Sequence, residues 1–283
     1  ALTGLGYATM TQVQAQSLPP ILKRQDVIIQ AKTGSGKTAA FAIGVLHHLN
    51  PRFFGVQAVV MCPTRELAEQ VGEATRQLAS RMSNVKVVML CGGKPFGAQR
   101  DSLHHGAHIV VGTPGRIQDH LQRGTLELKG VTTFVLDEAD RMLDMGFADV
   151  MAEITAKLPA DRQTLLLSAT FPDDIKKISR SIQKNPIQIT VDAEVVHDEV
   201  VLEQVFFEVQ KHERNVALLA LFEHYRPANA MVFCNTKKQC AEVARFLREH
   251  DIEAAAIHGD LEQRERDQVL LQFANNSCPV LVA

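Results

Sequence analysis

The pattern that most constrains the fold is an alternation of short, β-branched apolar runs with longer segments of helical spacing. The apolar runs in the first part of the chain lie at 26–30, 58–62, 85–90, 108–112, 133–137 and 164–168. Between them, apolar residues recur at helical spacing, as in residues 65–79. Because parallel strands need crossover helices, which cover both faces of the sheet, this alternation predicts an α/β fold built on a parallel sheet.

The alternation stops and then restarts in the last third of the chain, which predicts two domains. Residues 185–200 carry a proline and several acids and lack helical periodicity, as is typical of a domain boundary. Beyond them, strand-like runs at 204–210, 230–235, 253–258 and 279–283 alternate with helical segments at 213–224, 237–250 and 263–274. We expect a first domain over residues 1–188, a linker over 189–200 and a second, incomplete α/β domain over 201–283.

Composition excludes several classes of protein. The 283 residues include 30 basic and 32 acidic side chains, so the net charge is −2 and any binding of nucleic acid must depend on local residues. The five cysteines are far apart and form no C-x-x-C pair, so neither a disulfide framework nor a zinc site is expected, and a reduced, cytoplasmic compartment is favoured. No apolar run reaches the ~18 residues that a membrane span requires.

A glycine-rich segment, AKTGSGKT (31–38), joins the run 26–30 to the helical segment that follows. Small residues at such a junction let backbone N–H groups surround phosphate oxygens at the start of a helix. The pattern predicts that Lys37 contacts the terminal phosphates of a nucleotide and that the Thr38 hydroxyl binds Mg²⁺. Ala31 stands where the general pattern has its first glycine. The loop members expected at the phosphates are Ala31, Thr33, Gly34, Ser35, Gly36, Lys37 and Thr38.

Three carboxylates, Asp137, Glu138 and Asp140, follow the run 133–137. Carboxylates beside a buried strand are costly unless a cation lies among them. With a phosphate loop in the same chain, the expected cation is Mg²⁺ on a nucleotide, held by Asp137, while Glu138 orients or deprotonates the attacking water. The dipole of a following helix is another reason for acids here, and it accounts for Asp140 but not for the coincidence with the phosphate loop. Lys37, Asp137 and Glu138 are the predicted catalytic residues.

These segments occur in a familiar order. AKTGSGKT, PTRELA (63–68), GG (92–93), TPGR (113–116), DEAD (137–140) and SAT (168–170) resemble motifs I, Ia, GG, Ib, II and III of the DEAD-box RNA helicases. GYATMTQVQAQSLP (6–19) is similar to the Q motif, and VFCNT (232–236) and HGDLEQRERD (258–267) are similar to motifs IV and IVa. The segments LCGGKPFGAQRDSL and DEADRMLDMGF are most similar to the bacterial DbpA subgroup. The resemblance implies two RecA-like P-loop domains.

The resemblance also implies roles that spacing alone does not. Gln14 would read the adenine edge of ATP, with Tyr7 near the base, and Ser168 and Thr170 would couple the γ-phosphate to the grip on RNA. RNA contacts would come from Pro63, Thr64, Arg65, Gly92, Gly93, Thr113, Gly115 and Arg116 in the first domain and from Gln263 and Arg266 in the second. Backbone amides, hydroxyls and arginines bind phosphates without reading bases. Surface ion pairs remain an alternative for the arginines.

Parts of the family pattern are missing from these residues. The aromatic residue before the Q motif, motifs V and VI and the C-terminal RNA-recognition domain would lie outside the 283 residues. Motif VI supplies arginines to the ATP site, and an arginine finger is worth roughly 10³–10⁵ in rate. The expectation is therefore that this chain binds adenine nucleotide with almost no RNA-stimulated ATPase activity or unwinding.

The sequence predicts an ATP-dependent RNA helicase that unwinds or remodels short RNA duplexes in ribosomal RNA and large-subunit assembly. ATP and Mg²⁺ are the expected cofactors, and the protein is expected to be a cytoplasmic monomer. Two alternatives stay open: an ATP-gated RNA clamp or assembly factor with little unwinding, and a P-loop ATPase directed at DNA. Unwinding of short RNA duplexes tests the first, and competition between RNA and DNA tests the second, because 2′-OH contacts discriminate between them.

Overall fold

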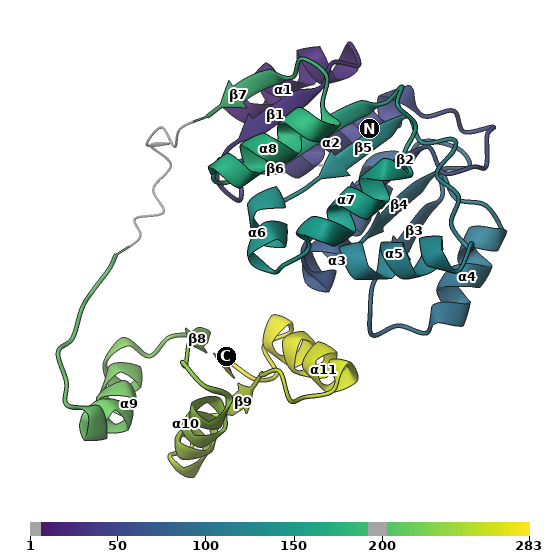
Figure 1. Ribbon diagram of the computed structural model, residues 1–283. Coiled ribbons are helices and arrows are strands. Elements are labelled where there is room, and N and C mark those ends of the chain that lie inside the picture. Colours follow the sequence, from purple (N-terminus) through teal and green to yellow (C-terminus); the bar gives the residue numbers. More distant parts are fainter. Residues whose placement is uncertain (1–6, 192–202) are drawn as a thin grey trace. The chain divides into compact units, whose positions relative to one another are not determined.

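The computed structural model describes residues 7–191 and 203–283 of the protein (Figure 1). The chain divides into two compact units, one on each side of residue 198. Within the described ranges, no helix combines the length and the apolar character needed to span a membrane.

The first unit is built on a parallel seven-stranded sheet in the order β3-β4-β2-β5-β6-β1-β7. Its strands are β1 (Val27–Gln30), β2 (Ala58–Met61), β3 (Val87–Leu90), β4 (Ile109–Gly112), β5 (Thr133–Leu136), β6 (Gln163–Ser168) and β7 (Ile187–Thr190). Each strand-like run predicted in this part of the sequence forms a strand. The central strands are buried on both faces and almost continuously apolar, as is typical of parallel strands.

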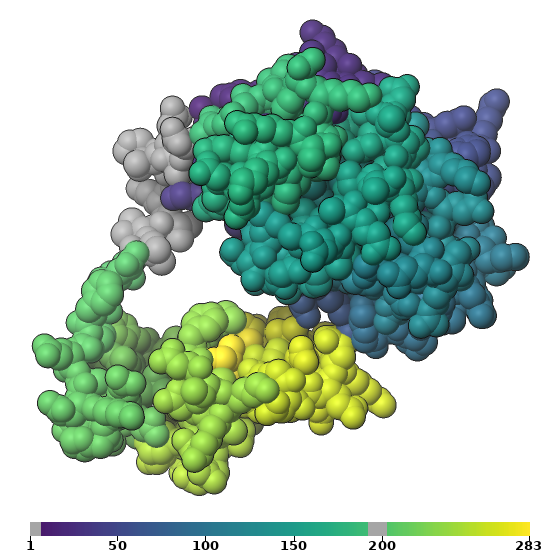
Figure 2. All heavy atoms as spheres, viewed as in Figure 1, coloured from purple at the N-terminus to yellow at the C-terminus, as the bar shows by residue number. Residues whose placement is uncertain are grey.

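Helices cover both faces of this sheet (Figure 1). They are α1 (Gln12–Leu22), α2 (Lys37–His48), α3 (Arg65–Ala79), α4 (Phe96–His104), α5 (Pro114–Gln122), α6 (Ala139–Asp144), α7 (Ala148–Ala156) and α8 (Asp173–Ile182). Side chains of α1, α2 and α3, such as Phe41, pack on one face, and side chains of α5, α6, α7 and α8, such as Ile154, pack on the other. Neighbouring strand residues, such as Val60 and Met61, alternate between the two cores. Figure 2 shows the face covered by α7 and α8.

The second unit has a parallel three-stranded sheet in the order β8-β10-β9. Its elements are a short 3₁₀ turn η2 (Lys211–Glu213), α9 (Arg214–Tyr225), β8 (Ala230–Val232), α10 (Lys237–Glu249), β9 (Ala254–Ala256), α11 (Gln263–Ala274) and β10 (Val280–Val282). Its small core joins α10, through Ala244 and Leu247, to β9 and β10. The two sheets confirm the α/β class and the parallel pairing predicted from the sequence.

Two expectations about the domain junction are wrong. Residues 189 and 190 belong to β7, which pairs with β1, so the expected linker begins too early. An edge strand pairs on one side only, and here Ile189 alone is buried, so this strand has no continuous apolar run that marks it in the sequence. Residues 204–210 form no strand in the structure, and Phe206 is 87% exposed, because β propensity needs a neighbouring strand to take effect. The rest of the linker, 192–200, lies outside the described residues.

Candidate functional site

The predicted site residues of the first unit share one edge of its sheet. Because β1 to β6 run parallel, their carboxyl ends meet at the same edge, where ligands of open α/β sheets bind. Three neighbouring strands carry the first group: Asp137 directly follows β5, β6 ends at Ser168, and β1 leads into the loop 31–38. We call these strand ends together the phosphate half. Three further neighbouring strands carry the second group: residues 63–65 follow β2, residues 113–116 follow β4, and residues 92–93 follow β3. We call these three segments together the arginine half. The sheet order thus sets the two groups side by side.

The loop 31–38 has the backbone conformation of a phosphate cradle. Gly34 and Gly36 adopt left-handed φ angles of 83° and 88°, which side chains other than glycine rarely tolerate. A Cβ added at Gly34 would meet nothing within 4 Å, so this glycine borders open space. The first N–H groups of α2 have no partner within the helix, and Ser35 Oγ is buried without a hydrogen-bond partner in the described part of the chain. The loop therefore has donors that suit an anion.

Lys37 lies buried at the first position of α2. Its Nζ donates hydrogen bonds to the carbonyl oxygens of Ala31 and Lys32, the second at 2.7 Å. Burial lowers the pKa of Lys37, and the charges of Asp137, Glu138 and Asp140 act against this shift. The ammonium group is thus tied to its own loop and faces the carboxylates. Thr38 follows it and is half-buried, whereas Thr33 is exposed.

Asp137 is only 3% exposed at the end of β5. Burial raises its pKa from 3.8 to about 6, although the charge of Lys37 opposes the shift. The next residue, Glu138, caps α6 with a φ of 53°, a strained conformation for a residue other than glycine. Its carboxylate lies 3.5 Å from Arg141 Nη1. The strand end therefore carries one buried carboxylate whose charge is incompletely compensated and one held in a fixed, strained position.

Asp140 joins this segment to the end of β6. Its Oδ2 accepts hydrogen bonds from the Thr170 amide at 2.9 Å and from the Thr170 hydroxyl at 2.7 Å. Burial would raise the pKa of Asp140, but these hydrogen bonds hold it below the ordinary value. The predicted contact between the SAT and DEAD segments is thus present through Thr170. Ser168, which ends β6, is buried.

A cavity of about 360 Å³ opens between these groups. Its walls are formed by Thr33, Lys37, Glu138, Asp140, Arg141, Asp144, Ser168 and Ala169. In the part of the chain that the structure describes, no three His, Cys, Asp or Glu side chains form a metal cage. Mg²⁺ in nucleotide sites takes one or two carboxylates together with phosphate oxygens and waters, so a buried Asp137 whose charge acts on Lys37 of the phosphate loop fits that ion.

The start of α1 is attached to the phosphate loop. Thr11 caps the helix, and its hydroxyl donates to the Ser35 carbonyl at 2.8 Å. Gln14 Nε2 donates to the Gly36 carbonyl at 3.2 Å, while its Oε1 accepts from the Thr11 amide. Sequence reasoning chose Gln14 but missed Thr11, which the T-x-x-Q capping box could have revealed. Tyr7 is 37% exposed before α1, and both adenine contacts stay predictions.

Ion pairs connect segments of the arginine half. Thr64 caps α3, and Arg65 Nε lies 3.3 Å from Glu69 Oε1. Lys94 Nζ, beyond the Gly92–Gly93 turn, lies 2.6 Å from the same oxygen. Burial would raise the pKa of Glu69, but Lys94 and Arg65 hold it below the ordinary value. Glu69 thus connects two segments that were predicted to contact RNA. Of the other residues predicted to contact RNA here, Pro63 is buried, whereas Gly92 is half-buried and Gly93 is exposed.

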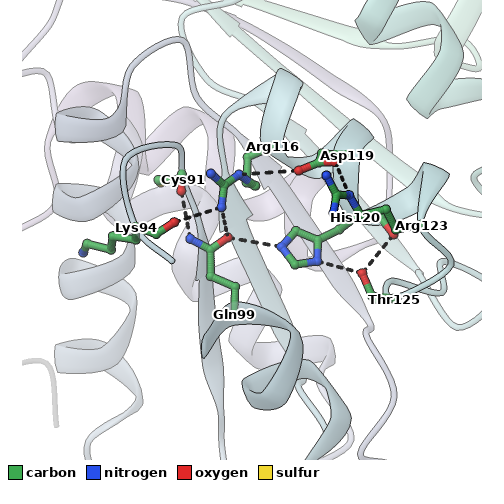
Figure 3. Close-up of polar contacts among 8 residues, drawn as sticks. All are labelled: Cys91, Lys94, Gln99, Arg116, Asp119, His120, Arg123 and Thr125. Carbon is green, nitrogen blue, oxygen red and sulfur yellow. Dashed lines mark hydrogen bonds and ion pairs between the residues drawn. The ribbon is translucent and has the colours of Figure 1, made fainter. Parts of the chain in front are cut away.

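The segment 113–116 forms the first turn of α5. Thr113 caps the helix, and Gly115 is exposed with nothing within 4 Å of an added Cβ. Arg116 Nη1 donates to the Lys94 carbonyl at 3.1 Å and to Gln99 Oε1 at 3.2 Å (Figure 3). Sequence reasoning missed Gln99, because a glutamine inside a helix carries no motif signal.

The remaining predicted residues, Gln263 and Arg266, begin α11 of the second unit. Gln263 Nε2 donates to Asp267 Oδ1 at 3.0 Å. Arg266 Nε donates to the Leu261 carbonyl at 3.2 Å, and Nη2 lies 3.4 Å from the Gly259 carbonyl. These contacts shape the loop before α11, so Arg266 has a local structural role. Contact of either residue with RNA stays a prediction.

Comparison with known proteins places this geometry in context. Residues 11–178 match the DEAD/DEAH box helicase family, and residues 211–283 match the helicase conserved C-terminal domain family. The ATP-dependent RNA helicase DbpA of Escherichia coli (strain K12) is 51% identical over 282 residues, which are 100% of this chain and 61% of that protein. The ATP-dependent RNA helicase DeaD of the same organism is 40% identical over 283 residues, 45% of its length. The chain thus spans less than two thirds of either relative.

Solved structures show the same fold. A DEAD box protein from the hyperthermophile Methanococcus jannaschii superimposes with a TM-score of 0.66 and 38% identity, over 100% of this chain and 76% of that one. Dbp5 of Saccharomyces cerevisiae, bound to RNA and ADP BeF3, gives a TM-score of 0.83 and 28% identity, over 99% and 71% of the two chains.

We expect Asp137→Asn to stabilise the protein when nucleotide and metal are absent. The pKa of Asp137 is raised to about 6 in the folded state, so the stability it contributes is full below pH 3.8 and is lost as the pH rises through 6. At pH 7.5 the amide should therefore raise the free energy of unfolding by about 1–3 kcal/mol, and at pH 5 by about half as much. Urea denaturation at the two pH values measures the difference.

The matched control is Asp161→Asn, which changes an exposed aspartate of the same unit and should have no such pH-dependent effect. A loss of stability in Asp137→Asn at pH 7.5, or a gain equal at both pH values, would contradict the assignment of a costly buried charge.

Proposed function

The chain belongs to the DEAD/DEAH box helicase family, and from that premise we propose that it acts as part of an ATP-dependent RNA helicase that unwinds or remodels short RNA duplexes. The observation that carries the proposal is the shared carboxyl edge of the sheet. There, the phosphate half lies directly beside the arginine half, because β5 pairs with β2. A nucleotide and an RNA backbone on the two halves would contact adjacent strands of one rigid sheet.

The phosphate half suits ATP and Mg²⁺. The phosphates would lie on the N–H groups of loop 31–38 and on Lys37, and Asp137 with Thr38 would hold Mg²⁺. The bound ion would neutralise charge on the phosphates. Glu138, fixed by its strained backbone at the cavity wall, would orient the attacking water and accept its proton at the carboxylate. Gln14 and Tyr7 would contact the adenine.

The bond between Asp140 and Thr170 supports a coupling role for the end of β6. It ties the segment that carries Glu138 to the segment that begins with Ser168. A change in the nucleotide that moves one segment would therefore move the other. We propose that Ser168 and Thr170 transmit the state of the γ-phosphate to the arginine half in this way.

The arginine half suits an RNA backbone rather than base edges. Its polar groups are loop amides, the hydroxyls of Thr64 and Thr113 and the partly buried guanidinium groups of Arg65 and Arg116 at the starts of α3 and α5, and groups of these kinds bind phosphates regardless of sequence. In the second unit, Gln263 and Arg266 would add contacts. We further propose ribosomal RNA in large-subunit assembly as the target and a monomer in the cytoplasm as the working form, with the similarity to DbpA as the support for the RNA class.

Two substitutions separate binding from catalysis at the phosphate half. Lys37→Ala removes a cation from the phosphates and should weaken ATP binding by about 10–100-fold, the worth of a charge-assisted hydrogen bond. Glu138→Gln keeps Asp137 for the metal and should change ATP affinity by less than about twofold. Equilibrium titration with a fluorescent ATP analogue in the presence of Mg²⁺ measures both. Equal losses of affinity in the two variants would refute the assigned roles.

Arg116→Ala tests the RNA surface. It should weaken binding to unrelated RNA sequences to a similar extent, because a phosphate contact is lost, and should make the slope of log K against log salt shallower by about 0.7. Fluorescence anisotropy in the presence of a non-hydrolysable ATP analogue measures affinity and slope. Arg180→Ala, an exposed arginine on α8, should change neither. Loss of affinity for one RNA sequence alone would instead indicate base readout.

A further inference from the structure

A buried glutamine connects two of the three segments of the arginine half, the turn at 92–93 and the segment 113–116. Gln99 of α4 is 5% exposed, and its Nε2 donates to the Cys91 carbonyl at 2.8 Å (Figure 3). Its Oε1 lies 3.2 Å from Arg116 Nη1 and 3.1 Å from His120 Nε2. One amide therefore connects the end of β3, the guanidinium group of Arg116 and the ring of His120. We call Gln99, His120 and Thr125 the amide network.

The orientation of this amide determines the tautomer of His120. A carbonyl oxygen only accepts, so Gln99 Nε2 faces Cys91 and Gln99 Oε1 faces two donors. His120 Nε2 must then carry a proton. Burial lowers the pKa of His120 to about 4, and the charge of Arg116 adds to the shift, so the ring is neutral at neutral pH. Its Nδ1 lies 2.8 Å from the Thr125 hydroxyl oxygen, and the same hydroxyl lies 3.1 Å from the His120 carbonyl oxygen.

Ring contacts hold His120 in place from the other side. Phe96, the first residue of α4, stacks on His120 with ring centroids 4.1 Å apart and an interplanar angle of 14°. The guanidinium group of Arg123 lies 4.4 Å from the centroid of Phe96. The start of α4 and the end of α5 are thereby fixed against each other, which leaves the amide network little freedom to move.

The consequence for Arg116 is that one edge of its guanidinium group is fixed. Both Nη1 hydrogens are engaged, one by the Lys94 carbonyl and one by Gln99 Oε1. Asp119 lies farther off, 4.0 Å from Nε. Among the residues that the structure describes, none accepts a hydrogen bond from Nη2. The side chain has therefore lost its rotamer freedom before any ligand arrives, and Nη2 remains for an external acceptor.

We propose that Gln99 and His120 are positioning residues for RNA: through the amide of Gln99 they hold Arg116 and the Cys91–Lys94 segment as one rigid surface for backbone phosphates. Neither side chain contacts the RNA itself. The inference rests on the proposed role of Arg116 in RNA binding. It adds that the contribution of Arg116 to RNA affinity depends on Gln99, a buried residue outside the sequence motifs of the helicase family.

A second buried glutamine of the same unit serves as the matched control. Gln183, at the end of α8, donates to the Val27 carbonyl at 3.1 Å and to the Thr164 carbonyl at 2.9 Å, and it accepts from the Ser179 hydroxyl at 2.8 Å. It thus resembles Gln99 in burial and in the number of hydrogen bonds, but it has no contact with Arg116. Truncating either glutamine removes similar support from the fold.

A double-mutant cycle tests the inference. We measure RNA affinity by anisotropy, in the presence of a non-hydrolysable ATP analogue, for Gln99→Ala, Arg116→Ala, the double variant and Gln183→Ala. Gln99→Ala should weaken RNA binding about 3–10-fold in the wild-type background and by less than twofold in the Arg116→Ala background, because its effect passes through Arg116. Gln183→Ala should lower the unfolding midpoint comparably and leave RNA affinity within twofold.

Three outcomes would overturn the inference. An equal loss from Gln99→Ala in both backgrounds would mean that Gln99 acts on the fold or on RNA directly. If Gln183→Ala loses as much RNA affinity as Gln99→Ala, the effect of Gln99→Ala reflects a loss of stability and not the positioning of Arg116. An unchanged affinity in Arg116→Ala alone would refute the proposed RNA role of that arginine and, with it, the positioning of Arg116 by Gln99.

If Gln99→Ala does not fold, Gln99→Glu gives the answer. The carboxylate keeps acceptors for Arg116 and His120, loses the N–H donor to the Cys91 carbonyl, and places a negative charge beside the guanidinium group, where it competes with phosphate. RNA affinity should fall, and the salt slope should become shallower as it does in Arg116→Ala, while affinity for the ATP analogue stays within twofold. A wild-type salt slope in this variant would overturn the inference.

Discussion

The cost of burying the charge of Asp137 is the constraint on which the first unit's site depends. The residue ends a strand that is buried on both faces, and burial raises its pKa to about 6, since Lys37 compensates only part of its charge. A sheet in which β5 ends in a carboxylate and β1, on the other side of β6, ends in a loop of unpaired N–H groups has, at one edge, places for a cation and for an anion. A metal-bound nucleotide satisfies both at once.

The arginine half lies on the same edge of the same sheet. Backbone pairing of β5 with β2 makes the two halves parts of one sheet, and polar side chains then hold the proposed site residues in place. Asp140 holds Thr170, Glu69 joins Arg65 to Lys94, and Gln99 fixes Arg116. In each case an acceptor immobilises a donor, so the positions of the proposed site residues depend on neighbouring side chains that the motifs do not single out for ligand contact.

The sequence predicts most of the first unit because its strands carry their own signal. Buried parallel strands are continuously apolar, and glycines with left-handed φ angles mark the loop 31–38. Contacts between distant segments could not be predicted: the sequence indicates Thr11 as a helix cap but not its contact with Ser35, and Gln99 meets His120 only after folding. Residues 204–210 failed for the converse reason, since their alternation suits a strand but no partner strand pairs with them in the described second unit.

The central claim is that Asp137 is a partly uncompensated carboxylate that a nucleotide-bound cation completes. The most direct measurement is the gain in ATP affinity on adding Mg²⁺, followed from pH 7.5 to pH 5 and corrected for the binding of Mg²⁺ to free nucleotide. Because a proton on Asp137 would compete with the metal, the account predicts a constant gain above the pKa of about 6 and a loss of about tenfold per pH unit below it. A gain that stays constant down to pH 5 would contradict the account.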